Sequence, residues 1–194
     1  MLNRQYLTVA TLLLVFVFSG NASPKFQFLK IDPSLQSFDS FPNISSSVKF
    51  YVGTVYGSSD EEKMDTIGFT RTGRKTKAPI LCSSPLSIKK SLQGLFSSKG
   101  VLAPDPSSST FIIQVEIKDF SIKETSHALS QTIDGHVKLE VILVDPFSAE
   151  NTRRMMVESQ NSKTAMDTSK YAEEVMRGAL ESALLEAIRS LSKS

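Results

Sequence analysis

Apolar and polar residues alternate along two stretches in the second half of the chain. The first stretch spans residues 111–118 and the second spans residues 136–144. A period of two places every second side chain on the same side of a strand, so each stretch predicts a strand with one side toward a core and one toward water. Residues 121–132 either continue the first strand past a bend or form a loop. A weaker pattern over residues 153–160 predicts a third strand, antiparallel to the second.

Two other stretches carry apolar residues at helical spacing. Ser84-Pro85 favours a helix start, because Ser caps helices and Pro suits their first position, and Gly100 favours the end of that helix. Its apolar stripe consists of Ile88, Leu92, Leu95 and Phe96. A second helix is predicted over residues 168–191, with a stripe of Met176, Leu180, Ala183, Leu184, Ala187, Ile188 and Leu191. Glu173 and Arg177 are spaced to pair on its wet side.

The first half of the chain contributes one clear strand. Residues 48–56 are rich in β-branched and aromatic side chains and predict that strand, while the polar residues 57–65 predict a loop. Residues 66–70 could form a further short strand. The main elements therefore follow the order β-α-β-β-β-α. Because both helices have one apolar stripe to bury, we expect an α+β fold, with two amphipathic helices on one face of a small, mainly antiparallel sheet. This single domain is expected to span residues 48–194.

The first 22 residues have the features of a secretory signal peptide. An apolar run over residues 7–18 follows Arg4, and Gly20 and Ala22 suit the −3 and −1 positions of a cleavage site. The run is shorter than the roughly 20 residues that span a membrane, so we expect cleavage after Ala22, with an uncleaved anchor as the alternative. The Ser- and Pro-rich residues 23–47 are expected to form a tether, some of whose Phe side chains dock on the domain.

Composition limits the classes of function. The formal net charge is only +2, which gives no overall field to attract nucleic acid. Cys82 is the single cysteine, so no intramolecular disulfide can form, and we expect this side chain to be buried as a small apolar group.

The residues that most often carry catalysis do not form a recognisable pattern. His127 and His136 lie nine positions apart with no second cysteine, which does not suggest a metal site, and His136 is expected on the wet side of its strand. The acidic residues of the 57–65 loop lack the spacing of a calcium-binding loop. Asp145 precedes a proline and is expected to form a turn. We therefore expect no catalytic residue, no metal and no cofactor.

One local concentration of charge suggests a binding site. Arg71, Arg74, Lys75 and Lys77 fall within seven residues of a predicted turn. Such a group could contact lipid headgroups, lipopolysaccharide phosphates or an acidic protein, and the alternative is a solvated loop. Aromatic residues are not interleaved with these cations, which argues against single-stranded nucleic acid.

Three features in this order resemble the YajG-like family of bacterial envelope lipoproteins: Ile67-Gly68 before a polar turn, a helix that ends at Gly100, and a valine-rich strand that leads into Asp145-Pro146. The resemblance covers about residues 48 to 192. It implies an exported protein, typically lipid-anchored at the outer membrane. However, Asn21 occupies the position of the cysteine that carries the lipid in such proteins, and an amide cannot form that thioether.

The residues and the resemblance together predict an exported, non-catalytic protein of the cell envelope. It would act as a binding or accessory module in the periplasm or at the outer membrane. The alternative is an accessory component of lipid or lipopolysaccharide transport, with an acyl chain held between helices and sheet. Possible partners are an envelope protein, a glycan or a lipid headgroup, with peripheral membrane association and without nucleic acid. The pattern does not predict an oligomeric state.

Overall fold

A computed structural model of the chain describes residues 27–31, 41–42, 44–57, 64–71 and 77–192. The strands are β1 (Gln27–Phe28), β2 (Phe50–Tyr56), β3 (Asp65–Arg71), β4 (Lys77–Cys82), β5 (Phe111–Ser126), β6 (Gln131–Asp145) and β7 (Ser148–Ala165). The helices are α2 (Ser84–Ser98) and α3 (Ala172–Ser192), with short 3₁₀ helices η2 (Pro106–Ser108) and η3 (Ser169–Tyr171).

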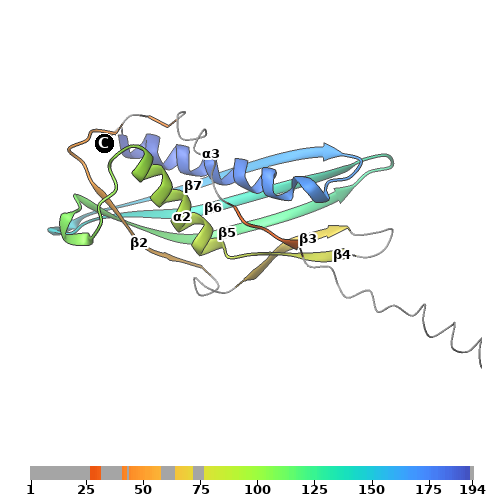
Figure 1. Ribbon diagram of the computed structural model, residues 1–194, viewed down its shortest axis with the longest axis horizontal. Coiled ribbons are helices and arrows are strands. Elements are labelled where there is room, and N and C mark those ends of the chain that lie inside the picture. The colour runs from red at the N-terminus through yellow and green to blue at the C-terminus, as the bar shows by residue number, and fades with distance from the viewer. Residues whose placement is uncertain (1–26, 32–40, 43, 58–63, 72–76, 193–194) are drawn as a thin grey trace, which may run out of the picture.

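All of these strands belong to one mixed sheet, which is arranged around β5. The strands β5, β6 and β7 form a long antiparallel meander (Figure 1). Because β6 occupies one edge of β5 throughout, β2 and β3 share the other edge, and both run parallel to β5. Beyond β3 come β4, which is antiparallel to it, and β1, which is parallel to β4. The predicted α+β class with two helices is confirmed. The sheet is mixed, because β1–β4, β2–β5 and β3–β5 are parallel pairs.

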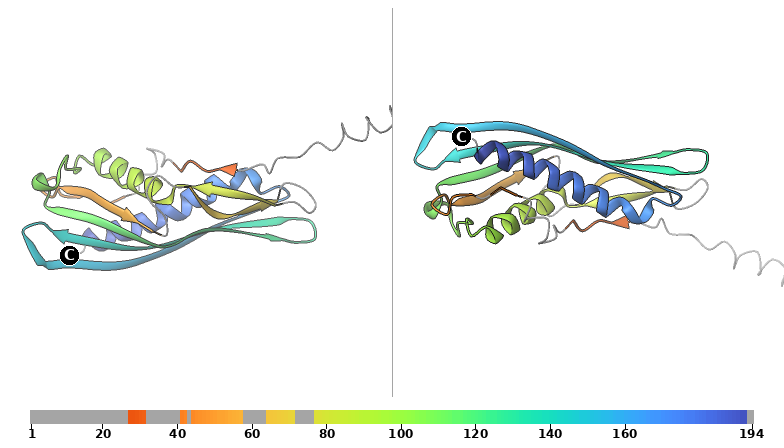
Figure 2. Two further views of the ribbon diagram at one scale, coloured as in Figure 1. Left: turned by 90° about the horizontal axis from the view of Figure 1, so that it is seen from below. Right: turned by 90° about the horizontal axis from the view of Figure 1, so that it is seen from above.

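The two helices cover one face of this sheet, which we call the helix face. The helix α3 packs along β6 and β7, and α2 packs against β2, as the views in Figures 1 and 2 show. Phe50 of β2 stacks on Phe96 of α2 with ring centroids 4.9 Å apart. The opposite face carries no helix among the described residues, and we call it the outer face.

The predicted helical stripes and the predicted strand alternation together form the core. The stripe residues of α2 are all buried, as are those of α3 except for the half-buried Leu191. They meet alternate residues of β5 and β6, including Val115, Val137 and Leu139, in one continuous cluster. The predicted end of α2 is also confirmed, because Gly100 has φ +67°, a left-handed conformation that favours glycine.

Part of the expected tether is built into the domain. Leu29 and Ile31 flank the short strand β1 on its C-terminal side, and both are buried in the core together with Phe41. The Leu29 amide donates a hydrogen bond to the Leu81 carbonyl oxygen at 2.8 Å. Phe28, in contrast, is exposed. This stretch therefore adds both a strand and apolar side chains to the fold.

Candidate functional site

The two described ends of the predicted basic turn are Arg71, the last residue of β3, and Lys77, the first residue of β4. Arg71 and Lys77 are register partners in these two strands, and Arg74 and Lys75 fall outside the described residues. Lys77 is exposed and lines a groove of about 290 Å³ between the β3–β4 hairpin and β5. The structure brings Lys123 of β5 and Phe69 of β3 into the same groove. Sequence reasoning missed both residues. The antiparallel pairing of β3 with β4 brings Phe69 close to Lys77, and the parallel pairing of β3 with β5 adds Lys123.

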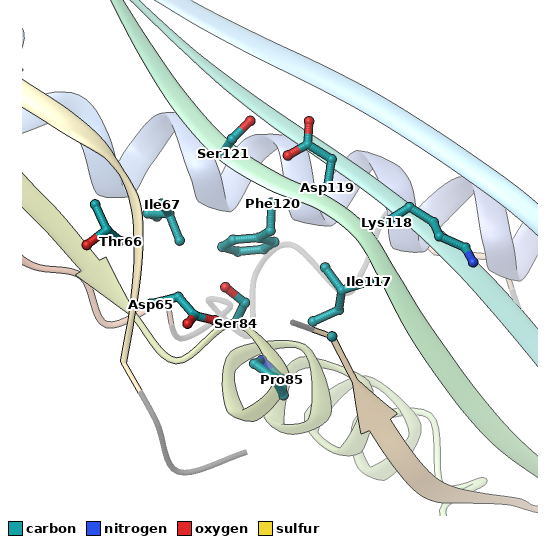
Figure 3. A pocket seen from close by; sticks show the side chains of 11 residues that line it. Asp65, Thr66, Ile67, Ser84, Pro85, Ile117, Lys118, Asp119, Phe120 and Ser121 are labelled. Carbon is teal, nitrogen blue, oxygen red and sulfur yellow. The ribbon is translucent and has the colours of Figure 1, made fainter. Parts of the chain in front are cut away.

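A second pocket opens where β2 ends and β3 begins along the shared edge of β5. It has a volume of about 260 Å³ and is shown in Figure 3. Ile117 and Phe120 of β5 supply apolar walls, while Asp65 and Ser84 approach from β3 and the start of α2 (Figure 3). This pocket contains no histidine or cysteine side chain. Its polar lining consists of hydroxyl, carboxylate and ammonium groups, including those of Ser121, Asp119 and Lys118.

The outer face carries a network of ion pairs across β5, β6 and β7. The Lys118 ammonium lies 2.5 Å from Glu116 Oε1 and 3.1 Å from Glu140 Oε2. Arg154 of β7 approaches the other oxygen of Glu140 at 3.3 Å. The pKa of Lys118 is raised by its hydrogen bonds to Glu116 and Glu140, and that of Glu140 is lowered by Lys118 and then by Arg154. These four side chains form one connected set of ion pairs across the three strands.

A second group of ion pairs adjoins the first and is centred on His136. This histidine lies on the wet side of β6, as predicted, but two carboxylates hold it: Nδ1 is 2.7 Å from Asp119 Oδ2 of β5, and Nε2 is 3.0 Å from Glu158 Oε1 of β7. Lys138 also pairs with Glu158, at 2.7 Å. Hydrogen bonding to Asp119, and then to Glu158, raises the pKa of His136, whereas Lys138 and then His136 lower the pKa of Glu158. We call the two groups together the charge ladder; its members are Glu116, Lys118, Asp119, His136, Lys138, Glu140, Arg154 and Glu158.

The His136 arrangement is suited to structure and not to base catalysis. Ser121 is the register partner of His136 on β5, so a serine and a histidine do lie side by side. Both ring nitrogens, however, already bind carboxylates, and this favours the protonated imidazolium, which has no lone pair to accept a proton.

The other candidate nucleophile is not accessible. Cys82 is buried as predicted, lies 3.6 Å from Ser87 Oγ, and has a pKa raised by burial. Within the described stretches, no three His, Cys, Asp or Glu side chains are arranged to hold a metal ion. Asp145 forms the expected turn, with Oδ1 accepting a hydrogen bond from the Phe147 amide at 2.8 Å.

Apolar and amphipathic side chains surround the charge ladder on the outer face. Tyr56 and Met156 lie in register on either side of Glu116 and Glu140, and they are 38% and 51% exposed. Toward the β6–β7 turn, the register aligns Tyr51, Ile112 and Val144 in a half-buried row across three strands. The alternation of residues within each strand indicated a side that faces water. Which residues of neighbouring strands lie next to one another depends on the register between strands, and no single stretch of sequence reveals that register.

No family model matches this chain, and a search of curated proteins finds no match. The resemblance to the YajG-like family therefore stays a prediction. Among the described residues, no helix has both the length and the apolar character needed to cross a membrane.

Similar chains are found among solved structures of bacterial proteins. One is a Xanthomonas campestris protein of the DUF330 family, at 13% identity and a TM-score of 0.47, with 86% of this chain and 91% of that chain covered. A second is a minor lipoprotein from Acinetobacter baumannii, at 10% identity and a TM-score of 0.39, with coverages of 76% and 94%. A third is the lipoprotein GNA1162 from Neisseria meningitidis, at 8% identity and a TM-score of 0.35, with coverages of 76% and 99%. The structural neighbours of this chain thus include bacterial lipoproteins.

Proposed function

We propose that this chain is a non-catalytic binding module of the bacterial cell envelope, which docks an envelope protein on the outer face of its sheet. The observation that carries the proposal is the composition of that face. Tyr51, Tyr56, Met156 and Arg154 lie there on one continuous sheet. Tyr, Met and Arg are the residue types that protein interfaces favour over the rest of the surface.

The charge ladder supports the same proposal. Its side chains are positioned by ion pairs that cross three strands, so a partner would not have to order them on binding. Charges of both signs alternate along the ladder, which favours a partner with the complementary pattern and disfavours others. Export to the envelope rests on the signal-like residues 1–22, and Asn21 favours a form without lipid at that position.

The alternative role in lipid transport finds less support in the geometry. It needs an apolar groove between the helices and the sheet. In the described part of the chain, that space is occupied by the core cluster, where Leu95, Leu180 and Leu139 are fully buried. We therefore favour a protein partner.

Site-specific cross-linking in the cells that produce the chain tests the proposal. A photo-reactive phenylalanine replaces Tyr56 or Met156 on the outer face, and a control replaces the exposed Glu186 of α3. We expect one defined adduct from the two outer-face positions and none from position 186. Glu140→Lys should abolish this adduct, because it reverses a charge in the middle of the ladder. Equal adducts from all positions, or no adduct from the outer face, would contradict the proposal.

A further inference from the structure

Exposed apolar side chains gather at the end of the molecule where the β5–β6 turn lies. Leu129 in that turn and Met166 after β7 are each 88% exposed. Both lie close to one register pair of β6 and β7: Met166 directly follows Ala165, and Leu129 precedes Gln131 by two residues. Phe69 of β3, which is 52% exposed, lies at the same end, since Gly68 pairs with Ile122 of β5. Side chains as exposed as those of Leu129 and Met166 do not contribute to the core.

Two exposed lysines accompany these apolar residues in a groove that also contains Glu124. Lys77 and Lys123 line the groove beside Phe69, and neither forms an ion pair with any described residue, although Asp134 is the register partner of Lys123. Lysines elsewhere on the outer face behave differently, because Lys118 and Lys138 both pair with carboxylates. Lys170 adds a third exposed cation near Met166, over the ring of Tyr171. We call this region, made up of Phe69, Lys77, Lys123, Leu129 and Met166, the hairpin end.

We infer that the hairpin end rests on the surface of a bilayer that contains anionic phospholipids. Leu129 and Met166 would enter the boundary between headgroups and acyl chains, where apolar side chains of surface-bound proteins are buried. Lys77 and Lys123 would contact the phosphates, with their long side chains extended along the groove toward the headgroups. The hairpin end lies beyond the charge ladder along the same long strands, and its test uses lipid vesicles without a protein partner, so either proposal can fail while the other stands.

Fluorescence from probes at the two ends of the full chain tests this inference. Leu129→Cys places a thiol at the hairpin end, and Phe147→Cys places one at the opposite end, in a turn where the side chain is 81% exposed. The buried Cys82 should not react in the folded protein, so an environment-sensitive dye labels only the introduced thiol. The labelled chains are mixed with vesicles of phosphatidylcholine alone, or with vesicles that contain equal parts of phosphatidylglycerol.

We expect a blue shift of the dye at position 129 with the anionic vesicles, a much smaller shift with the neutral ones, and no shift at position 147. The double substitution Lys77→Glu, Lys123→Glu should weaken the response at position 129 by roughly thirtyfold or more in lipid concentration, because each lysine near an anionic surface contributes substantially to binding. Lys90→Glu, at an exposed position of α2, is the matched control and should have little effect. Equal shifts at both ends, equal shifts with both lipids, or no effect of the double substitution would overturn the inference.

Discussion

His136 lies on the predicted wet side of its strand, but its two carboxylate partners were not predicted. Its imidazole bridges Asp119 and Glu158 on the two neighbouring strands, with Lys138 beside Glu158. Hydrogen bonding to Asp119 is the main cause of its raised pKa. The folded protein therefore holds the imidazolium proton more tightly than the unfolded chain does, and protonation of His136 is linked to folding.

This linkage predicts how stability changes with pH. The contribution of His136 is fully present below the pKa of the unfolded histidine, about 6.5, and is lost as the pH rises through the higher pKa of the folded state. His136→Gln should remove this part of the pH dependence, which for such a partly exposed group amounts to about 1 kcal/mol or less. Urea unfolding of both proteins between about pH 6 and pH 8 measures the effect. A wild-type curve parallel to that of the variant would contradict it.

Gly68 is the residue at which the sheet leaves no room for a side chain. A Cβ atom built there would lie 2.3 Å from the Ile122 carbonyl oxygen, a backbone atom that cannot move aside cheaply. Gly68→Ala should therefore separate β3 from β5 and lower the free energy of unfolding by about 2–4 kcal/mol. Gly100→Ala is the control, because nothing lies within 4 Å and only the left-handed backbone costs about 1 kcal/mol. Equal losses in the two variants, measured by chemical denaturation, would show that the contact with Ile122 does not matter.

At the scale of elements, the short strand β1 and the residues after it are the least expected part of the fold. Ile31 is buried, whereas Phe28 in the same segment is 67% exposed. Ile31→Ala should cost about 2–5 kcal/mol through lost burial and the cavity that remains. Phe28→Ala removes a larger side chain from the surface and should leave the urea midpoint almost unchanged. If both variants were equally stable, this segment would not belong to the folded unit.

The sequence predicts elements well where one period persists over many residues. The stripe of α3 and the alternation of β6 repeat often enough to be recognised, and Arg177 pairs with Glu173 at 2.6 Å as the helical spacing requires. The short β4 was not predicted, because it contains Pro79, a residue that usually argues against a strand. The β1 strand is only two residues long and is stabilised by its partner β4, so no local pattern marks it. Parallel pairing with β5 joins residues that are far apart in the chain. It places Tyr56 of β2 beside the charge ladder and brings β3, with Phe69, beside β5 at the hairpin end.

At the scale of the whole molecule, the two proposed surfaces are compatible. The hairpin end lies at one end of the long strands, while the outer face runs along their length. A domain that stands on a membrane at its hairpin end would present the charge ladder sideways. A partner docked there could lie on the same membrane beside it. The sequence indicated a basic stretch and a wet side of the sheet, but only the register of the packed strands shows that Lys123 and the charge ladder lie at different positions along the same strand.

The continuous core further predicts that the molecule unfolds as one unit. Cys82 lies at the end of β4 with no exposed surface, in the same cluster as residues of β5, β6 and both helices. Burial also raises the pKa of its thiol, so that the reactive thiolate should form only when the core opens. The urea concentration at which Cys82 becomes reactive toward a thiol reagent should therefore coincide with the midpoint of the loss of helical circular dichroism. If Cys82 reacted at clearly lower urea concentrations, the β3–β4 hairpin would open separately from the β5–β7 meander. The hairpin end would then include a locally unstable element.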